Sequence, residues 1–70
     1  MNKLREARKA KGLSQLKLAF VTGIPPSEIS RIENGWIVAY PGWRQRFARA
    51  LGVPELEIFP LGEKLGTSRD

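Results

Sequence analysis

The sequence predicts an all-α domain, a compact bundle of five short helices, in a chain of 70 residues. Three observations indicate this fold. Glycine and proline divide the chain at short intervals, and these residues commonly end and begin helices. Between the breaks, apolar residues recur at spacings of three and four, which places them on one side of a helix. No segment shows the alternating pattern of a half-buried strand, and there is no internal repeat.

The first two helices are bounded by polar caps and glycines. Asn2 can cap a first helix near residues 2–11, and Gly12 can end that helix in the left-handed conformation. Ser14 can cap a second helix near residues 15–22, which another glycine stops. The turn between the second helix and the next is therefore expected to be short.

Prolines open the other three helices. A proline fits the first helical position because a residue there needs no partner for its N–H group. Pro26 accordingly begins a third helix near 26–34, whose Ile29 and Ile32 face inward. Two further helices begin at Pro41 and Pro54, near residues 41–50 and 54–59. In the last of them, Leu56, Ile58 and Phe59 are expected to cover the core.

The composition excludes most catalytic and metal chemistry. The chain has no cysteine and no histidine, so disulfides, thiolate zinc sites and histidine-based catalysis are ruled out. A domain of this size buries only roughly 60% of the surface of its unfolded chain, which leaves little room for a deep catalytic cavity. We therefore expect no enzyme activity, no metal and no cofactor, and no small-molecule effector is evident.

The sequence also lacks the segments that would direct a chain into a membrane or to secretion. No apolar stretch approaches the roughly 18 residues that a membrane-spanning helix needs. No signal-peptide core follows the basic N-terminus. We expect a cytoplasmic protein without a membrane partner, with one helical domain over residues 1–60 and a flexible tail over residues 61–70.

The charge of the chain is strongly basic and concentrated at one end. The net charge is +5, and residues 1–17 contain six lysines and arginines against Glu6 alone. A basic surface of this kind suits a polyanion such as a nucleic acid. A solvated helix face that keeps a small protein soluble would give the same composition, so the charge alone leaves both interpretations open.

The most informative segment is residues 13–35, which reads as two short helices joined by a tight turn. Two helices in this arrangement can place the second one in the major groove of DNA. The face of the third helix that points away from its isoleucines carries Ser27, Ser30 and Arg31. Arg31 can pair with a guanine, although a surface arginine partnered by Glu28 would have the same sequence.

The chain resembles the phage-repressor and Cro-type helix-turn-helix family, also called the xenobiotic-response-element family. The resemblance covers about residues 3–59. The stretches that carry it are LREAR at 4–8, KGLSQ at 11–15, LA at 18–19, GI at 23–24, ISRIENG at 29–35 and ARALGV at 48–53. It implies a five-helix bundle of the lambda-repressor type, which binds double-stranded DNA as a homodimer with the third helix in the major groove.

The resemblance also implies roles for individual residues. The base-contacting residues would be Pro26, Ser27, Ser30 and Arg31. The phosphate-contacting residues would be Gln15, Lys17, Asn34 and Gly35, the last two through their backbone N–H groups. Arg8 and Glu33 would form a structural ion pair between the first and third helices. The function that follows is sequence-specific DNA binding by a small transcriptional regulator.

Three departures from the family pattern concern affinity and partners. Pro26 has no donor where members commonly have a polar side chain. The loop at 36–40 is uncharged where members usually carry lysine or arginine, and Leu16 and Phe20 occupy positions that are usually polar. These apolar side chains either fold back on the core or form a contact surface. We expect self-association through Trp36, Ile37, Val38 and Tyr40. The alternative is a protein-interaction module, an antitoxin-like protein or a phage adaptor, that binds a protein through the same surface.

Overall fold

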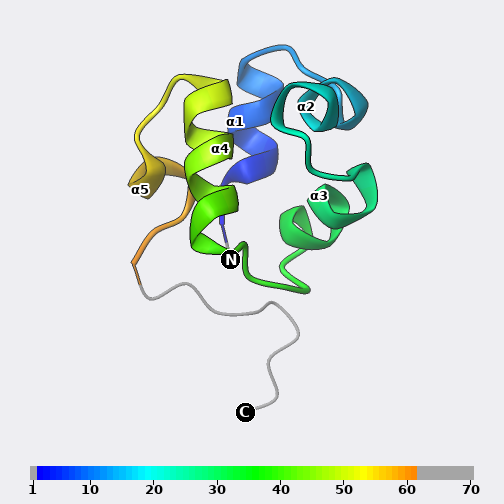
Figure 1. The fold of residues 1–70 in the computed structure, drawn as a ribbon. Coiled ribbons are helices and arrows are strands. Elements are labelled where there is room, and N and C mark those ends of the chain that lie inside the picture. Colours follow the sequence, from blue (N-terminus) through cyan, green and yellow to red (C-terminus); the bar gives the residue numbers. More distant parts are fainter. Residues whose placement is uncertain (1, 62–70) are drawn as a thin grey trace.

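The computed structural model describes residues 2–61, and within them the chain forms five helices and no strand. The helices are α1 (Leu4–Ala10), α2 (Gln15–Thr22), α3 (Pro26–Glu33), α4 (Pro41–Leu51) and α5 (Glu55–Ile58) (Figure 1). The predicted all-α fold of five helices is confirmed for this part of the chain. The tail predicted at 61–70 lies outside the described residues except for Leu61.

The residues predicted to begin and end α2, and to begin α3, do so in the structure. The Ser14 hydroxyl accepts a hydrogen bond from the Lys17 backbone N–H at 3.0 Å, which satisfies one of the unpaired donors of the first turn. Gly23 follows α2 with a φ of 76°, in the left-handed region that favours glycine. Pro26 occupies the first turn of α3. The turn between the two helices is therefore as short as the sequence predicts.

The prediction that α1 spans residues 2–11 is wrong at its start and differs by one residue at its end, where Gly12 has the predicted left-handed conformation with a φ of 78°. Asn2 caps the helix from outside it: its Oδ1 accepts the Leu4 N–H at 2.9 Å, and its Nδ2 donates to the Ile32 carbonyl, also at 2.9 Å. The helix therefore begins at Leu4, two residues later than predicted. The other helices differ from the prediction by no more than one residue at either end, because their caps are local in sequence.

The core is formed by apolar side chains from every helix, from two connections between helices and from Phe59, which follows α5. The buried residues are Leu4, Leu18, Ile24, Ile29, Ile32, Ala39, Phe47, Leu51, Ile58 and Phe59. The Phe47 and Phe59 rings pack with their centroids 6.0 Å apart. Leu56 does not cover the core as expected but is exposed. Residues two apart on a helix point about 200° apart, so Leu56 faces solvent where Ile58 faces inward.

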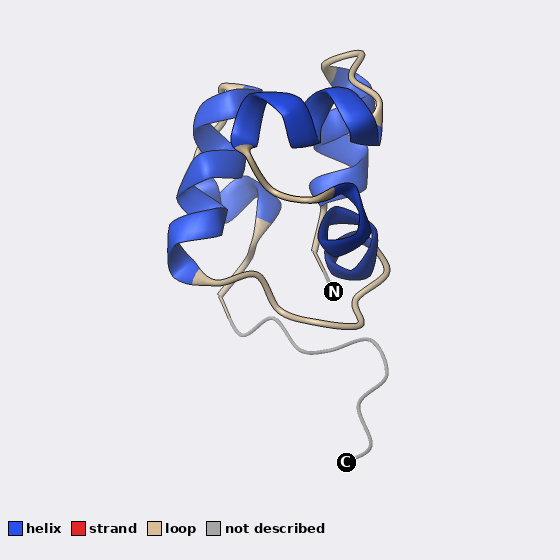
Figure 2. Ribbon diagram, turned by 45° about the vertical axis from the view of Figure 1, so that its right-hand side comes forward, coloured by secondary structure: helices blue, strands red, loops and turns tan. Residues whose placement is uncertain are grey.

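The arrangement of the helices leaves α3 at one side of the molecule. α2 packs against α3 and α4, α1 packs against α3 and α4, and α5 packs against α4. α3 and α5 lie on opposite sides in Figure 1, and Figure 2 shows the loop at 34–40 crossing from α3 to α4. None of the helices in the described part of the chain is long and apolar enough to span a membrane.

Candidate nucleic-acid interface

α3 has two chemically different faces. Ile29 and Ile32 are fully buried, three residues apart, against the core. The opposite side presents Ser27 and Arg31 to solvent, with Ser30 half-buried beside them. Pro26 is also exposed, at the start of the helix. All four residues predicted to contact bases therefore lie on the solvent-facing part of one short helix.

The N-terminus of α2 lies close to the end of α3. Lys17 is exposed in the first turn of α2, where free backbone N–H groups attract anions. Gln15 opens α2, but its side chain turns toward α3: its Nε2 donates to Oε1 of Glu33 at 2.9 Å. The amide predicted to hold a phosphate is thus fixed by a contact inside the protein.

Glu33 is the centre of the polar network that joins the three N-terminal helices. Its carboxylate has no exposed surface and accepts hydrogen bonds from Arg8 Nε at 2.6 Å and from Arg8 Nη2 at 3.2 Å. Arg5 Nε approaches the same carboxylate to 3.3 Å. The Arg8 side chain is only 10% exposed, and its Nη1 also donates to the Leu13 carbonyl. The structure thus brings together the two residues predicted to form an ion pair.

The environment of Glu33 lowers its pKa. Burial acts in the opposite direction and by itself raises the pKa of this carboxyl, because burial disfavours the charged form. The hydrogen bonds from Arg8, Gln15 and Arg5, together with the positive charge of Arg8, outweigh burial. The pKa of Glu33 therefore lies below the ordinary value of 4.5.

This shift makes the stability of the fold sensitive to acid. A carboxyl with a lowered pKa stabilises the folded state above its ordinary pKa of 4.5, and that stabilisation is lost as the pH falls toward the lowered value. We expect the melting temperature to drop as the pH falls below about 4.5 toward the lowered pKa of Glu33. The drop should be smaller in the double variant Arg8→Met/Glu33→Met, which lacks the titrating carboxylate. Equal slopes in thermal melts of the two proteins would contradict this role of Glu33.

The end of α3 differs from the expected phosphate site. The backbone N–H groups of Asn34 and Gly35 donate to the carbonyls of Ser30 and Ile32, each at 3.0 Å. These are the groups predicted to approach phosphate, and in this structure they are used within the chain. The Asn34 side chain accepts from Arg5 Nη2 at 2.8 Å and donates to Ser30 Oγ at 3.4 Å. Side chains, rather than backbone donors, are what this corner presents.

Arg5 is the residue at this corner that the sequence did not single out, although the basic residues of the first helix were expected as a group to contact phosphate. Its guanidinium bonds both Glu33 and Asn34, yet nearly half of the side chain stays exposed. It adds a cation beside the end of α3. A signal was available in the sequence, because Arg5 precedes Arg8 by three residues and so lies on the same side of α1.

The loop at 36–40 divides between core and surface. Ile37 packs against the core and Ala39 is buried, whereas Trp36 is 56% exposed and Tyr40 62% exposed. Tyr40 meets the Trp43 ring edge-on, with centroids 4.8 Å apart. Val38 is also exposed. Alternate residues of the loop therefore point inward and outward, and self-association through the exposed ones stays a prediction.

A second exposed apolar surface lies on α2. Leu16 and Phe20 are four residues apart on its outer side, and Phe20 is 82% exposed. Together with Pro25 and Pro26 they line a shallow apolar hollow between α2 and the start of α3. The Lys17 ammonium lies 5.7 Å from the centre of the Phe20 ring. This surface is continuous with the exposed beginning of α3.

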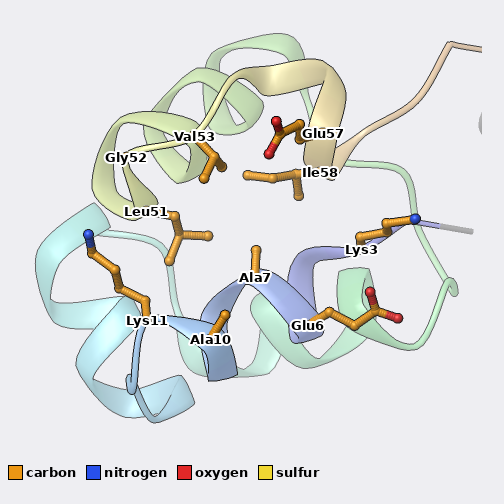
Figure 3. A pocket seen from close by; sticks show the side chains of 10 residues that line it. All are labelled: Lys3, Glu6, Ala7, Ala10, Lys11, Leu51, Gly52, Val53, Glu57 and Ile58. Carbon is orange, nitrogen blue, oxygen red and sulfur yellow. The ribbon is translucent and has the colours of Figure 1, made fainter.

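Another hollow, of about 490 Å³, lies elsewhere, among α1, the end of α4 and α5 (Figure 3). Apolar side chains such as Ala7 and Val53 form its floor. Two lysines and two glutamates surround it, Lys3, Lys11, Glu6 and Glu57. Because the charges balance and no residue of α2 or α3 lines it, this hollow is not part of the basic surface around α3.

Comparison with known proteins agrees with this geometry. A family model described as helix-turn-helix matches residues 4–39, slightly more than half of the chain. The matched region contains α1, α2, α3 and most of the loop that follows. Searches of curated proteins and of solved structures returned no match. The chain belongs to the phage-repressor and Cro-type helix-turn-helix family of DNA-binding regulators.

Proposed function

We propose that the protein is a sequence-specific transcriptional regulator that binds double-stranded DNA with α3 in the major groove. The observation that carries this proposal is the division of α3 into a buried isoleucine face and an exposed face with Ser27, Ser30 and Arg31. The major groove is about 12 Å wide and admits an α-helix. In it the Arg31 guanidinium can pair with O6 and N7 of a guanine, while the two serines reach bases or phosphates.

Phosphate contacts on either side of α3 would hold it in the groove. On one side, Lys17 and the N-terminal turn of α2 offer a cation and a helix terminus. On the other, Arg5 and the Asn34 side chain lie together at the end of α3. The Glu33 network ties both corners to the helix, so that phosphate contacts can fix the register in which α3 reads bases.

The protein would bind as a homodimer on two half-sites. Trp36, Val38 and Tyr40 form an exposed apolar surface next to α4, and a self-complementary apolar patch is what a two-fold interface requires. Ile37 contributes less than expected because it packs against the core. Half-sites separated by one turn of DNA, about 34 Å, need two copies held in a fixed relation.

The exposure of Trp36 and Tyr40 also supports a second function. A protein-interaction module would use the same 36–40 surface to bind another protein, since large exposed apolar patches are unusual on monomers. The two functions predict different responses to salt. DNA binding releases counterions and weakens as salt rises, whereas an apolar protein interface does not.

A salt titration therefore tests the proposed function. With six or more phosphate contacts, affinity for duplex DNA should fall by about 10³-fold or more between roughly 50 and 200 mM salt. The variant Lys17→Gln should lower the slope of log affinity against log salt by about one. Lys11→Gln, which removes an equal charge beside the hollow among α1, α4 and α5, is the control and should change it less. Duplex affinity that is independent of salt would contradict the proposal.

A further inference from the structure

We propose that Pro26 reads a thymine through its 5-methyl group, an inference that rests on the proposed function. Pro26 begins α3 and is exposed at the end of the helix face that carries Ser27, Ser30 and Arg31. Its ring has no donor, and proline has no backbone N–H. Within a groove of polar base edges, Pro26 can therefore contribute only apolar contact. The thymine methyl is the one apolar group that a base displays in the major groove.

The surroundings of Pro26 strengthen this assignment. Pro26 does not stand alone among polar groups, because Pro25 and Leu16 line the same shallow apolar hollow next to it. When a methyl group packs against this surface, the methyl and the protein surface are both removed from water, which favours the contact. The neighbouring Lys17, exposed in the first turn of α2, can hold the DNA backbone beside the hollow.

Pro26 would also discriminate against other bases. A base that turned an exocyclic amino group toward the ring would lose the water bound to that donor and gain no partner. Specificity at this position would thus have an attractive part, the methyl contact, and a repulsive part, the unpaired donor. Arg31, five residues further along α3, would specify a guanine in the same half-site by hydrogen bonds.

Replacing thymine by deoxyuridine in the preferred duplex tests the inference with the unaltered protein, because it removes the methyl and nothing else. Binding should weaken by roughly three- to tenfold at one or two positions of each half-site, the loss expected for one buried methyl. In Pro26→Ser the same uridine substitution should change affinity by less than about twofold. Pro54→Ser is the matched control, since it alters an exposed proline at the start of α5, across the molecule from α3, and it should keep the full uridine effect.

The outcomes separate the inference from the proposed function. Sequence-specific binding that is indifferent to uridine at every position would overturn the role of Pro26 and leave the proposed function intact. A uridine effect that persists in Pro26→Ser would also overturn it, because another side chain would then contact the methyl. If no duplex sequence is preferred at all, the proposed function fails first and this inference falls with it.

Discussion

Glu33→Gln is expected to lower the free energy of unfolding by about 3–5 kcal/mol, because it removes one partner of a buried ion pair. The Glu33 side chain has no exposed surface, and the Arg8 side chain beside it is 90% covered. With glutamine, Arg8 keeps its buried charge but loses the opposite charge, and amide hydrogens face its N–H groups. A domain of this size has little stability to lose, so the variant should be largely unfolded at physiological temperature.

Two variants make this result specific. Glu28→Gln removes the same charge from a less buried position of α3 and should cost under about 1 kcal/mol, the size of a helix-dipole contribution. The double variant Arg8→Met/Glu33→Met removes both charges and should regain much of the lost stability, because an apolar pair leaves no unpaired buried ion. Chemical denaturation of the four proteins measures each value. If Glu33→Gln is as stable as the parent protein, the pair of Arg8 and Glu33 does not stabilise the fold.

Arg31→Ala is expected to cost about 1–3 kcal/mol of binding energy on the preferred duplex and much less on random DNA. A base contact carries sequence information, whereas a phosphate contact contributes equally to every sequence. Fluorescence titration with both duplexes measures the two losses. Arg49→Ala, an exposed arginine on α4, controls for the change in net charge. Equal losses on the two DNAs would assign Arg31 to the backbone.

Much of this fold follows from local chemistry, which explains where prediction succeeded. The Ser14 cap, the left-handed Gly23 and the proline at the start of α3 each depend on neighbours within four residues. The start of α1 depends instead on a bond between Asn2 and the Ile32 carbonyl, 30 residues away. The outward position of Leu56 depends on how a single helical turn docks on α4. The sequence around Asn2 and around Leu56 has no pattern that indicates either of these contacts.

The candidate site shows the same division. The outward face of α3 follows from the spacing of its isoleucines, which sequence alone gives. The direction of the Gln15 amide does not, because a side chain at a helix N-terminus can turn toward solvent or toward a buried carboxylate. In this protein the hydrogen bond to the Glu33 carboxylate fixes the direction of the Gln15 amide. The three-residue spacing of Arg5 and Arg8 places both on one side of α1, but the bonds from Arg5 to Glu33 and Asn34 follow only from the packing of α1 on α3.

Selection of bound sequences from random duplex DNA tests the central claim, that α3 reads bases, most directly. The proposed function predicts a reproducible site with two-fold symmetry, whose half-sites lie about 34 Å apart and contain a guanine that loses its enrichment in Arg31→Ala. The symmetry reports the dimer, and the dependence on Arg31 reports α3. Enrichment of no sequence, with retained binding of every duplex at low salt, would contradict the claim.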